Sequence, residues 1–130
     1  MIAIDTNVVA RFLADDDKAQ ADRAEAVLRR GPVVLPKTVL LETEWVLRAA
    51  YGFASADIAA GLRRLLGLAG VSAEDAPAGV RALAWYEAGL DFADALQLAS
   101  GVGASRFATF DRSLIRRARQ LAAAPTVFEP

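Results

Sequence analysis

The sequence predicts a mixed α/β fold in which a short parallel sheet is covered by helices on both faces. Short apolar runs alternate along the chain with longer segments that are rich in Ala and other helix formers. Apolar runs bounded by Gly, Pro and polar residues are typical of buried strands. Strands that alternate with helices form parallel sheets, and ligands bind beyond the carboxyl ends of such strands.

Five apolar runs are expected to be strands, and the segments between them are expected to be helices. The strands are residues 1–4, 33–35, 71–72, 106–110 and 126–128. The helices are residues 7–14, 19–30, 37–51, 56–68, 77–88, 91–101 and 112–121. Ser55 is expected to cap the fourth helix, and Gly52 and Gly70 are expected to end the third and fourth helices.

Composition indicates one compact domain, residues 1–130, and limits the chemistry that the chain can perform. Hydrophobic residues make up 55% of the chain and charged residues 24%, with a net charge of −1. The absence of His and Cys excludes thiol nucleophiles, Ser-His triads, His/Cys zinc sites and haem ligation. No stretch is long and apolar enough to span a membrane, and no signal peptide is recognisable. We therefore expect a cytoplasmic protein without membrane contact.

Two aspartates directly follow predicted strands. Asp5 follows the first strand, and Asp111 follows the strand at residues 106–110. Each has the position of a helix N-cap, which is the ordinary role of Asp at such a junction. Because parallel strands end at the same edge of a sheet, the pair also indicates a functional site there.

The helix at residues 37–51 contains two glutamates, which a helical wheel separates. At 100° per residue, Glu42 falls on the side of Val39 and Trp45, whereas Glu44 falls on the opposite side with Arg48. The wheel thus predicts that Glu44 is solvated and paired with Arg48, and that Glu42 projects toward the protein body. A buried carboxylate needs a cationic partner, so Glu42 is a candidate site residue.

The segment GLDFADAL raises a similar choice between Asp91 and Asp94. Asp91 is expected to be the N-cap of its helix, which makes Asp94 the third helical residue. Small residues flank Asp94 and favour close packing there, so we expect Asp94 to be the site residue and Asp91 a cap or a supporting group. The acidic run at residues 15–17 lacks the spacing of a calcium loop and is expected to be a solvated turn.

Four carboxylates from separate segments therefore remain as candidates. They are Asp5, Glu42, Asp94 and Asp111. If they lie together they repel one another, and a hard divalent cation such as Mg²⁺ or Mn²⁺ relieves the repulsion. Such an ion activates water and stabilises a phosphodiester transition state. Arg112, Arg116 and Arg119 lie on one side of the helix after Asp111, and they form either a phosphate-binding stripe or a plain solvated face.

Four segments in order resemble the PIN domain, and in particular the VapC-type toxins of bacterial toxin–antitoxin pairs. They are MIAIDTNVVARFL, VLLETEWVLRAAYG, GLDFADALQLASGVGA and FATFDRSL. The resemblance implies an α/β/α sandwich, a Mg²⁺-dependent endoribonuclease and an acidic quartet on Asp5, Glu42, Asp94 and Asp111. It also implies supporting roles for Asn7 and Thr109, a homodimer and a small antitoxin that blocks the site.

Two other functions are compatible with parts of the sequence. An aspartyl-nucleophile phosphatase uses a strand followed by Asp-x-Asp, but the second Asp is Asn7 here and no downstream Lys is well placed. A non-catalytic module whose acidic pocket serves folding or partner binding is the second alternative. RNA cleavage in Mg²⁺ and in excess chelator separates this module from a nuclease.

Overall fold

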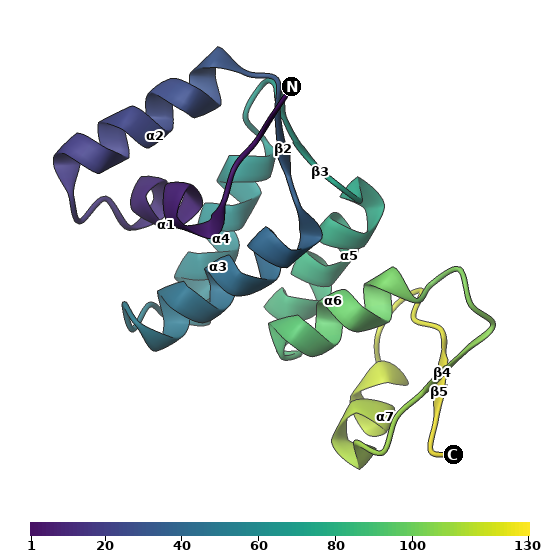
Figure 1. The fold of residues 1–130 in the computed structure, drawn as a ribbon. Coiled ribbons are helices and arrows are strands. Elements are labelled where there is room, and N and C mark those ends of the chain that lie inside the picture. Colours follow the sequence, from purple (N-terminus) through teal and green to yellow (C-terminus); the bar gives the residue numbers. More distant parts are fainter. The chain divides into compact units, whose positions relative to one another are not determined.

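The computed structural model describes residues 1–130 and confirms the predicted α/β class (Figure 1). Seven helices alternate with five short strands, and every strand pairing is parallel. The chain divides into two compact units, Met1–Ala76 and Pro77–Pro130, hereafter unit 1 and unit 2. That the whole chain folds as one domain stays a prediction. No helix is long and apolar enough to cross a membrane.

Unit 1 contains a three-stranded parallel sheet with the strand order β1-β2-β3. Its elements are β1 (Ile2–Ala3), α1 (Thr6–Ala14), α2 (Lys18–Arg30), β2 (Val33–Leu35), α3 (Lys37–Ala49), α4 (Ser55–Leu66) and β3 (Val71–Ala73). Helix α1 packs against α2 and α3, and α4 packs against α3 and β3. The central strand β2 supplies Val33 and Leu35, which are fully buried.

Unit 2 contains a two-stranded parallel sheet and three helices. Its elements are α5 (Ala76–Glu87), which begins at the unit boundary, α6 (Phe92–Ser100), β4 (Arg106–Ala108), α7 (Arg112–Ala118) and β5 (Thr126–Phe128). In the sheet, Arg106 pairs with Thr126 and Ala108 with Phe128. Tyr86 of α5 meets Phe92 of α6 edge to face, with the ring centroids 5.2 Å apart.

Several predicted boundaries and one burial prediction were wrong. Strand β1 is exposed rather than buried, because it lies at the edge of its sheet and only Ile4 beyond it is buried. Ser55 is the first residue of α4 and not its cap, which is Ala54 without a side-chain hydrogen bond. Helix α4 ends at Leu66 and its C-cap is Gly67, not the predicted Gly70, because the Gly67 N–H already bonds to carbonyls of the last turn.

Helices α3 and α7 also end earlier than predicted. Helix α3 ends at Ala49, and the next residues form a turn in which the rings of Tyr51 and Phe53 pack 5.9 Å apart. Helix α7 ends at Ala118 and the chain then turns, although helix formers continue to Leu121. Both differences reflect local packing and capping, which override intrinsic helix propensity at helix ends.

Thr43 of α3 is fully buried, and its hydroxyl has no hydrogen-bond partner. A buried hydroxyl without a partner costs free energy that an isosteric methyl group does not. We expect Thr43→Val to raise the free energy of unfolding by about 1 kcal/mol. Denaturant unfolding measures this, with Thr38→Val at an exposed position of the same helix as the control. A loss of stability in Thr43→Val would show that the hydroxyl has a stabilising partner.

Candidate active site

Asp5 and Asp111 are held in the same way, each at the junction between a strand and the next helix. Asp5 is the N-cap of α1, and its Oδ1 accepts a hydrogen bond of 3.1 Å from the Val8 N–H. Asp111 is the N-cap of α7, and its Oδ1 accepts one of 3.1 Å from the Leu114 N–H. The predicted caps are thus present. Each cap fixes one carboxylate oxygen and leaves the other, Oδ2, for a ligand.

The neighbours of these caps are also the polar residues that the sequence singled out. The Thr109 hydroxyl accepts a hydrogen bond of 3.0 Å from the Asp111 N–H, which fixes the backbone just before α7. Asn7 is exposed in the first turn of α1, two residues after Asp5. Phe110, between Thr109 and Asp111, is 77% exposed.

Asp91 and Asp94 have the positions in α6 that the sequence predicted. Asp91 is the N-cap, and its Oδ2 accepts a hydrogen bond of 3.1 Å from the Asp94 N–H. The Asp94 side chain is half-buried. Burial raises the pKa of the Asp94 carboxyl, and the negative charges of Asp91 and Asp111 raise this pKa further. Asp94 therefore lies in a place where negative charge accumulates and a cation is favoured.

The predicted faces of α3 were wrong. Glu44 is only 2% exposed and forms an ion pair with Arg48, the Oε2 to Nε distance being 2.9 Å. Glu42 is exposed, and so is Trp45, at 57%. The buried stripe of α3 runs through Leu40, Thr43, Glu44 and Leu47, which is the i, i+3, i+4, i+7 spacing of a helix face. Because this helix has apolar residues on nearly every side, the helical wheel did not identify the buried stripe.

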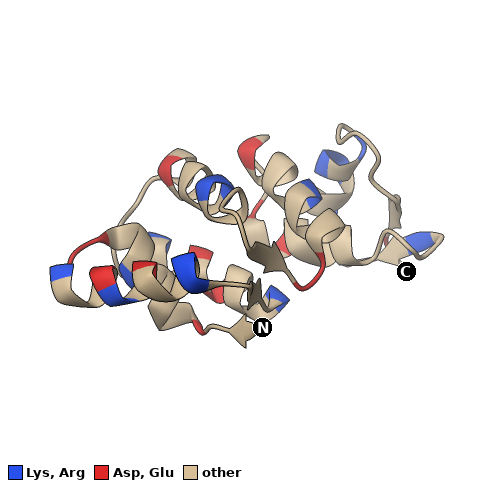
Figure 2. Cartoon of the chain, turned by 90° about the horizontal axis from the view of Figure 1, so that it is seen from above, with Lys and Arg blue, Asp and Glu red and all other residues tan.

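The four candidate carboxylates share one property that several other acidic residues lack. None of Asp5, Glu42, Asp94 and Asp111 forms an ion pair with Lys or Arg. Asp22, Glu25 and Glu44, in contrast, each pair with a basic residue four positions away. Acidic and basic positions are interspersed along the helices (Figure 2). Asp15, Asp17 and Asp57 also form no ion pair, so this property fits a cation site but does not single out the four candidates.

The four carboxylates are divided between the units. Asp5 and Glu42 belong to unit 1, where α1 packs against α3, and Asp94 and Asp111 belong to unit 2. Within neither unit do three acidic side chains lie close enough together to hold a metal ion alone. The donor set is oxygen only and carries uncompensated negative charge, which fits Mg²⁺ or Mn²⁺.

The raised pKa of Asp94 gives a prediction for stability in the absence of divalent ions. A carboxyl whose pKa is higher in the folded than in the unfolded state stabilises the fold at pH values below its unfolded-state pKa. This stabilisation is lost as the pH rises through the folded-state pKa. Asp94→Asn is therefore expected to raise the free energy of unfolding near about pH 7, and the gain should shrink toward about pH 4. Urea titrations at the two pH values measure it. A gain that is equal at both would show that the Asp94 charge is not the cause.

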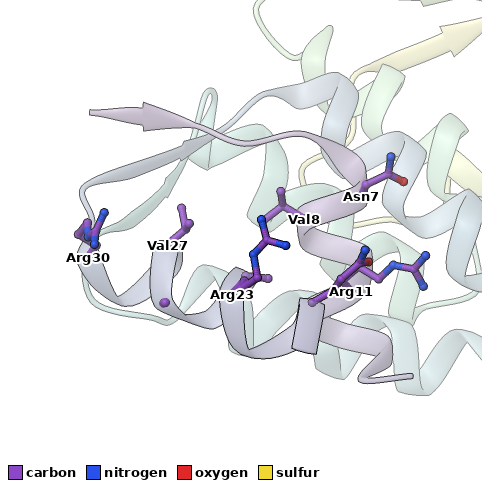
Figure 3. Close-up of a pocket in the computed structure, with 9 residues that line it drawn as sticks. Asn7, Val8, Arg11, Arg23, Val27 and Arg30 are labelled. Atoms are coloured by element: carbon purple, nitrogen blue, oxygen red, sulfur yellow. The ribbon is translucent and has the colours of Figure 1, made fainter. Parts of the chain in front are cut away.

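A pocket in unit 1 was not identified from the sequence. It has a volume of about 440 Å³ and lies between α1 and α2 (Figure 3). Its lining residues are Asn7, Val8, Arg11, Gln20, Arg23, Ala24, Ala26, Val27 and Arg30. The sequence signal for it is the pair Arg23 and Arg30, which are seven residues apart and so share a helix face.

The predicted arginine stripe after Asp111 is exposed, but its residues do not behave alike. The Arg112 guanidinium pairs with Glu129 at 3.2 Å, whereas Arg119 caps the C-terminus of α7. Arg116 and Arg117 lie in the last turn of α7, and Arg117 donates a hydrogen bond of 2.6 Å to the Gly89 carbonyl. Of the three residues of the predicted stripe, only Arg112 therefore has its side chain bound within unit 2.

Comparison with known proteins gives one family. No curated protein and no solved structure matches the chain significantly. Residues 2–120, however, match the PIN domain. This match agrees with the α/β architecture and spans all four candidate carboxylates. PIN domains are generally nucleases that bind RNA and typically use divalent metal ions. On this match over most of its length, the chain belongs to the PIN domain family.

Proposed function

We propose that the protein is a Mg²⁺-dependent endoribonuclease that hydrolyses RNA phosphodiester bonds, with Mn²⁺ as a possible substitute. In this proposal Asp5, Glu42, Asp94 and Asp111 hold the metal and carry catalysis. The observation that carries it is that these four carboxylates, in a chain of the PIN family, have no basic partner. Charge that no side chain compensates is free to bind a cation.

The residues contribute differently to such a site. The caps of α1 and α7 fix the Asp5 and Asp111 carboxylates, so that little conformational entropy is lost when they bind a ligand. The hydrogen bond from the Asp111 N–H to Thr109 supports this geometry. When bound, Mg²⁺ supplies a Lewis acid and a water of lowered pKa. The chain has no His to serve as a general base, and the metal-bound water would take over that contribution.

Removal of the metal is expected to abolish cleavage. Purified protein incubated with mixed cellular RNA should cleave it in Mg²⁺, lose the activity in excess chelator and regain it when Mg²⁺ is restored. Asp111→Asn, prepared in the same way, is the control against a contaminating ribonuclease. Cleavage that survives chelation would contradict the metal mechanism. A failure of any RNA to be cleaved would favour a non-catalytic binding module.

We further propose that the enzyme is the toxin of a toxin–antitoxin pair, acts in the cytoplasm as a homodimer and is blocked by a small antitoxin. The resemblance of its four motif segments to VapC-type toxins supports this biological role. Induced expression should then arrest growth, whereas the Asp5→Asn variant, expressed to the same level, should not. Growth that continues under expression of the active nuclease would count against a toxin.

A further inference from the structure

The pocket between α1 and α2 has the chemistry of a site for an anionic strand. We propose that it binds the RNA substrate, with the guanidinium groups of Arg23 and Arg30 contacting phosphates. This inference rests on the proposed ribonuclease function and adds a place where the substrate is held. It assigns to unit 1 a binding surface beside Asp5.

The polar groups that line the pocket are predominantly hydrogen-bond donors. Three of its nine lining residues are arginines, two are the amides Asn7 and Gln20, and none is a carboxylate. The remaining residues are Val8, Ala24, Ala26 and Val27, which make an apolar surface. In a chain with a net charge of −1, such a concentration of positive charge favours an anion locally.

Arg23 and Arg30 differ from their neighbours because no side chain neutralises them. Arg11 donates to Asp16 at 3.0 Å and to the Tyr51 hydroxyl at 3.0 Å, so it is held by the protein itself. Arg29 is paired with Glu25 at 2.7 Å. Arg23 and Arg30 have neither an ion pair nor a side-chain hydrogen bond. They remain available to replace the counterions of a phosphate backbone.

The spacing of these two arginines suits a strand rather than a single small anion. Seven residues of α-helix correspond to about 10.5 Å, and the two positions lie on nearly the same face. Figure 3 shows Arg23, Val27 and Arg30 along α2, with Asn7, Val8 and Arg11 on α1. A stacked strand advances about 3.4 Å per nucleotide, so the two side chains contact phosphates that are not adjacent.

The position of the pocket favours RNA over an acidic protein segment. Asn7 lines the pocket and lies two residues from Asp5, the cap of α1. A substrate has to reach the proposed catalytic carboxylate, and a strand held by α2 can continue past Asn7 to it. The apolar surface and the planar guanidinium groups also suit bases, which stack on Arg planes in single-stranded RNA.

The test measures binding of fluorescent single-stranded RNA to the whole protein in excess chelator, where cleavage does not interfere. The Arg23→Gln/Arg30→Gln variant is expected to bind about tenfold or more weakly at low salt. The slope of log K against log salt should fall in magnitude by about 1.4, since each phosphate contact contributes about 0.7 for single strands. The matched control is Arg29→Gln/Arg64→Gln, which removes the same charge from exposed positions outside the pocket.

Two further variants distinguish the effect of the arginine charges on RNA binding from the effect of the pocket's shape. Arg23→Lys/Arg30→Lys keeps both charges and should retain most of the salt dependence. Ala26→Leu fills part of the pocket at an exposed lining position and should weaken RNA binding while leaving the salt slope unchanged. Circular dichroism and thermal unfolding verify that every variant is folded.

The outcomes distinguish this inference from the proposed function. Equal RNA binding by the pocket variant and its control, or no binding by the parent protein, would overturn the inference while metal-dependent cleavage still stood. RNA binding that depends on the pocket, without any cleavage in Mg²⁺, would support the inference and defeat the nuclease proposal. If polyglutamate displaces the RNA as effectively as unlabelled RNA does, the pocket is a site for acidic protein segments and the inference fails.

Discussion

Asp94→Asn is expected to lower the rate of RNA cleavage by at least about a hundredfold, without loss of stability. The substitution keeps the shape of the side chain and removes the charge that a divalent ion requires. Because burial and the charges of Asp91 and Asp111 raise the pKa of Asp94, removing its charge also relieves repulsion. Single-turnover cleavage assays and urea unfolding measure the two effects on the same preparations.

The control for Asp94→Asn is Asp57→Asn, an equal charge change at an exposed residue of α4. It should leave cleavage unchanged. Activity within a fewfold of the parent in Asp94→Asn would remove Asp94 from the site. A marked loss of stability would instead show that the carboxylate is a structural group whose charge the fold needs.

Glu42→Gln and Glu44→Gln are expected to have opposite effects, although the residues are only two positions apart. Glu42 is exposed and has no ion-pair partner, so Glu42→Gln should change the stability little. Because Glu42 is a proposed metal ligand, the same substitution should abolish cleavage. Glu44 is buried and paired with Arg48. Its neutralisation should lower the free energy of unfolding by about 1–3 kcal/mol.

The contrast is measured by comparing cleavage per folded molecule with the denaturation midpoint for both variants. Glu44→Gln, assayed well below its unfolding midpoint, should retain most of the activity. The opposite result, in which Glu44→Gln loses cleavage and Glu42→Gln does not, would place the wrong glutamate in the site.

The sequence predicted the elements well because their signals are local. Asp5, Asp91 and Asp111 were expected to be N-caps and each accepts the cap hydrogen bond, since capping depends on residues within one turn. Strand β2 and strand β5 have the predicted boundaries. Short apolar runs between turn residues are strong local signals.

The faces of α3 and the exposure of β1 were not predictable in the same way. Both depend on which neighbours cover an element, and a helix that is apolar nearly all round gives no clear direction for burial. Glu44 shows this, because its i+4 partner Arg48 was correctly predicted but its burial was not. The pocket beside Asn7 was missed for the same reason, since it exists only when α1 packs against α2.

The central claim of the proposed function is that Asp5, Glu42, Asp94 and Asp111 bind a divalent ion. Paramagnetic broadening of backbone NMR signals by substoichiometric Mn²⁺ tests it directly. Signals around Asp5, Glu42, Asp94 and Asp111 are expected to broaden at the same Mn²⁺ concentrations, and Asp94→Asn is expected to weaken the broadening at all four residues. Broadening confined to one unit, or none in folded protein, would contradict it.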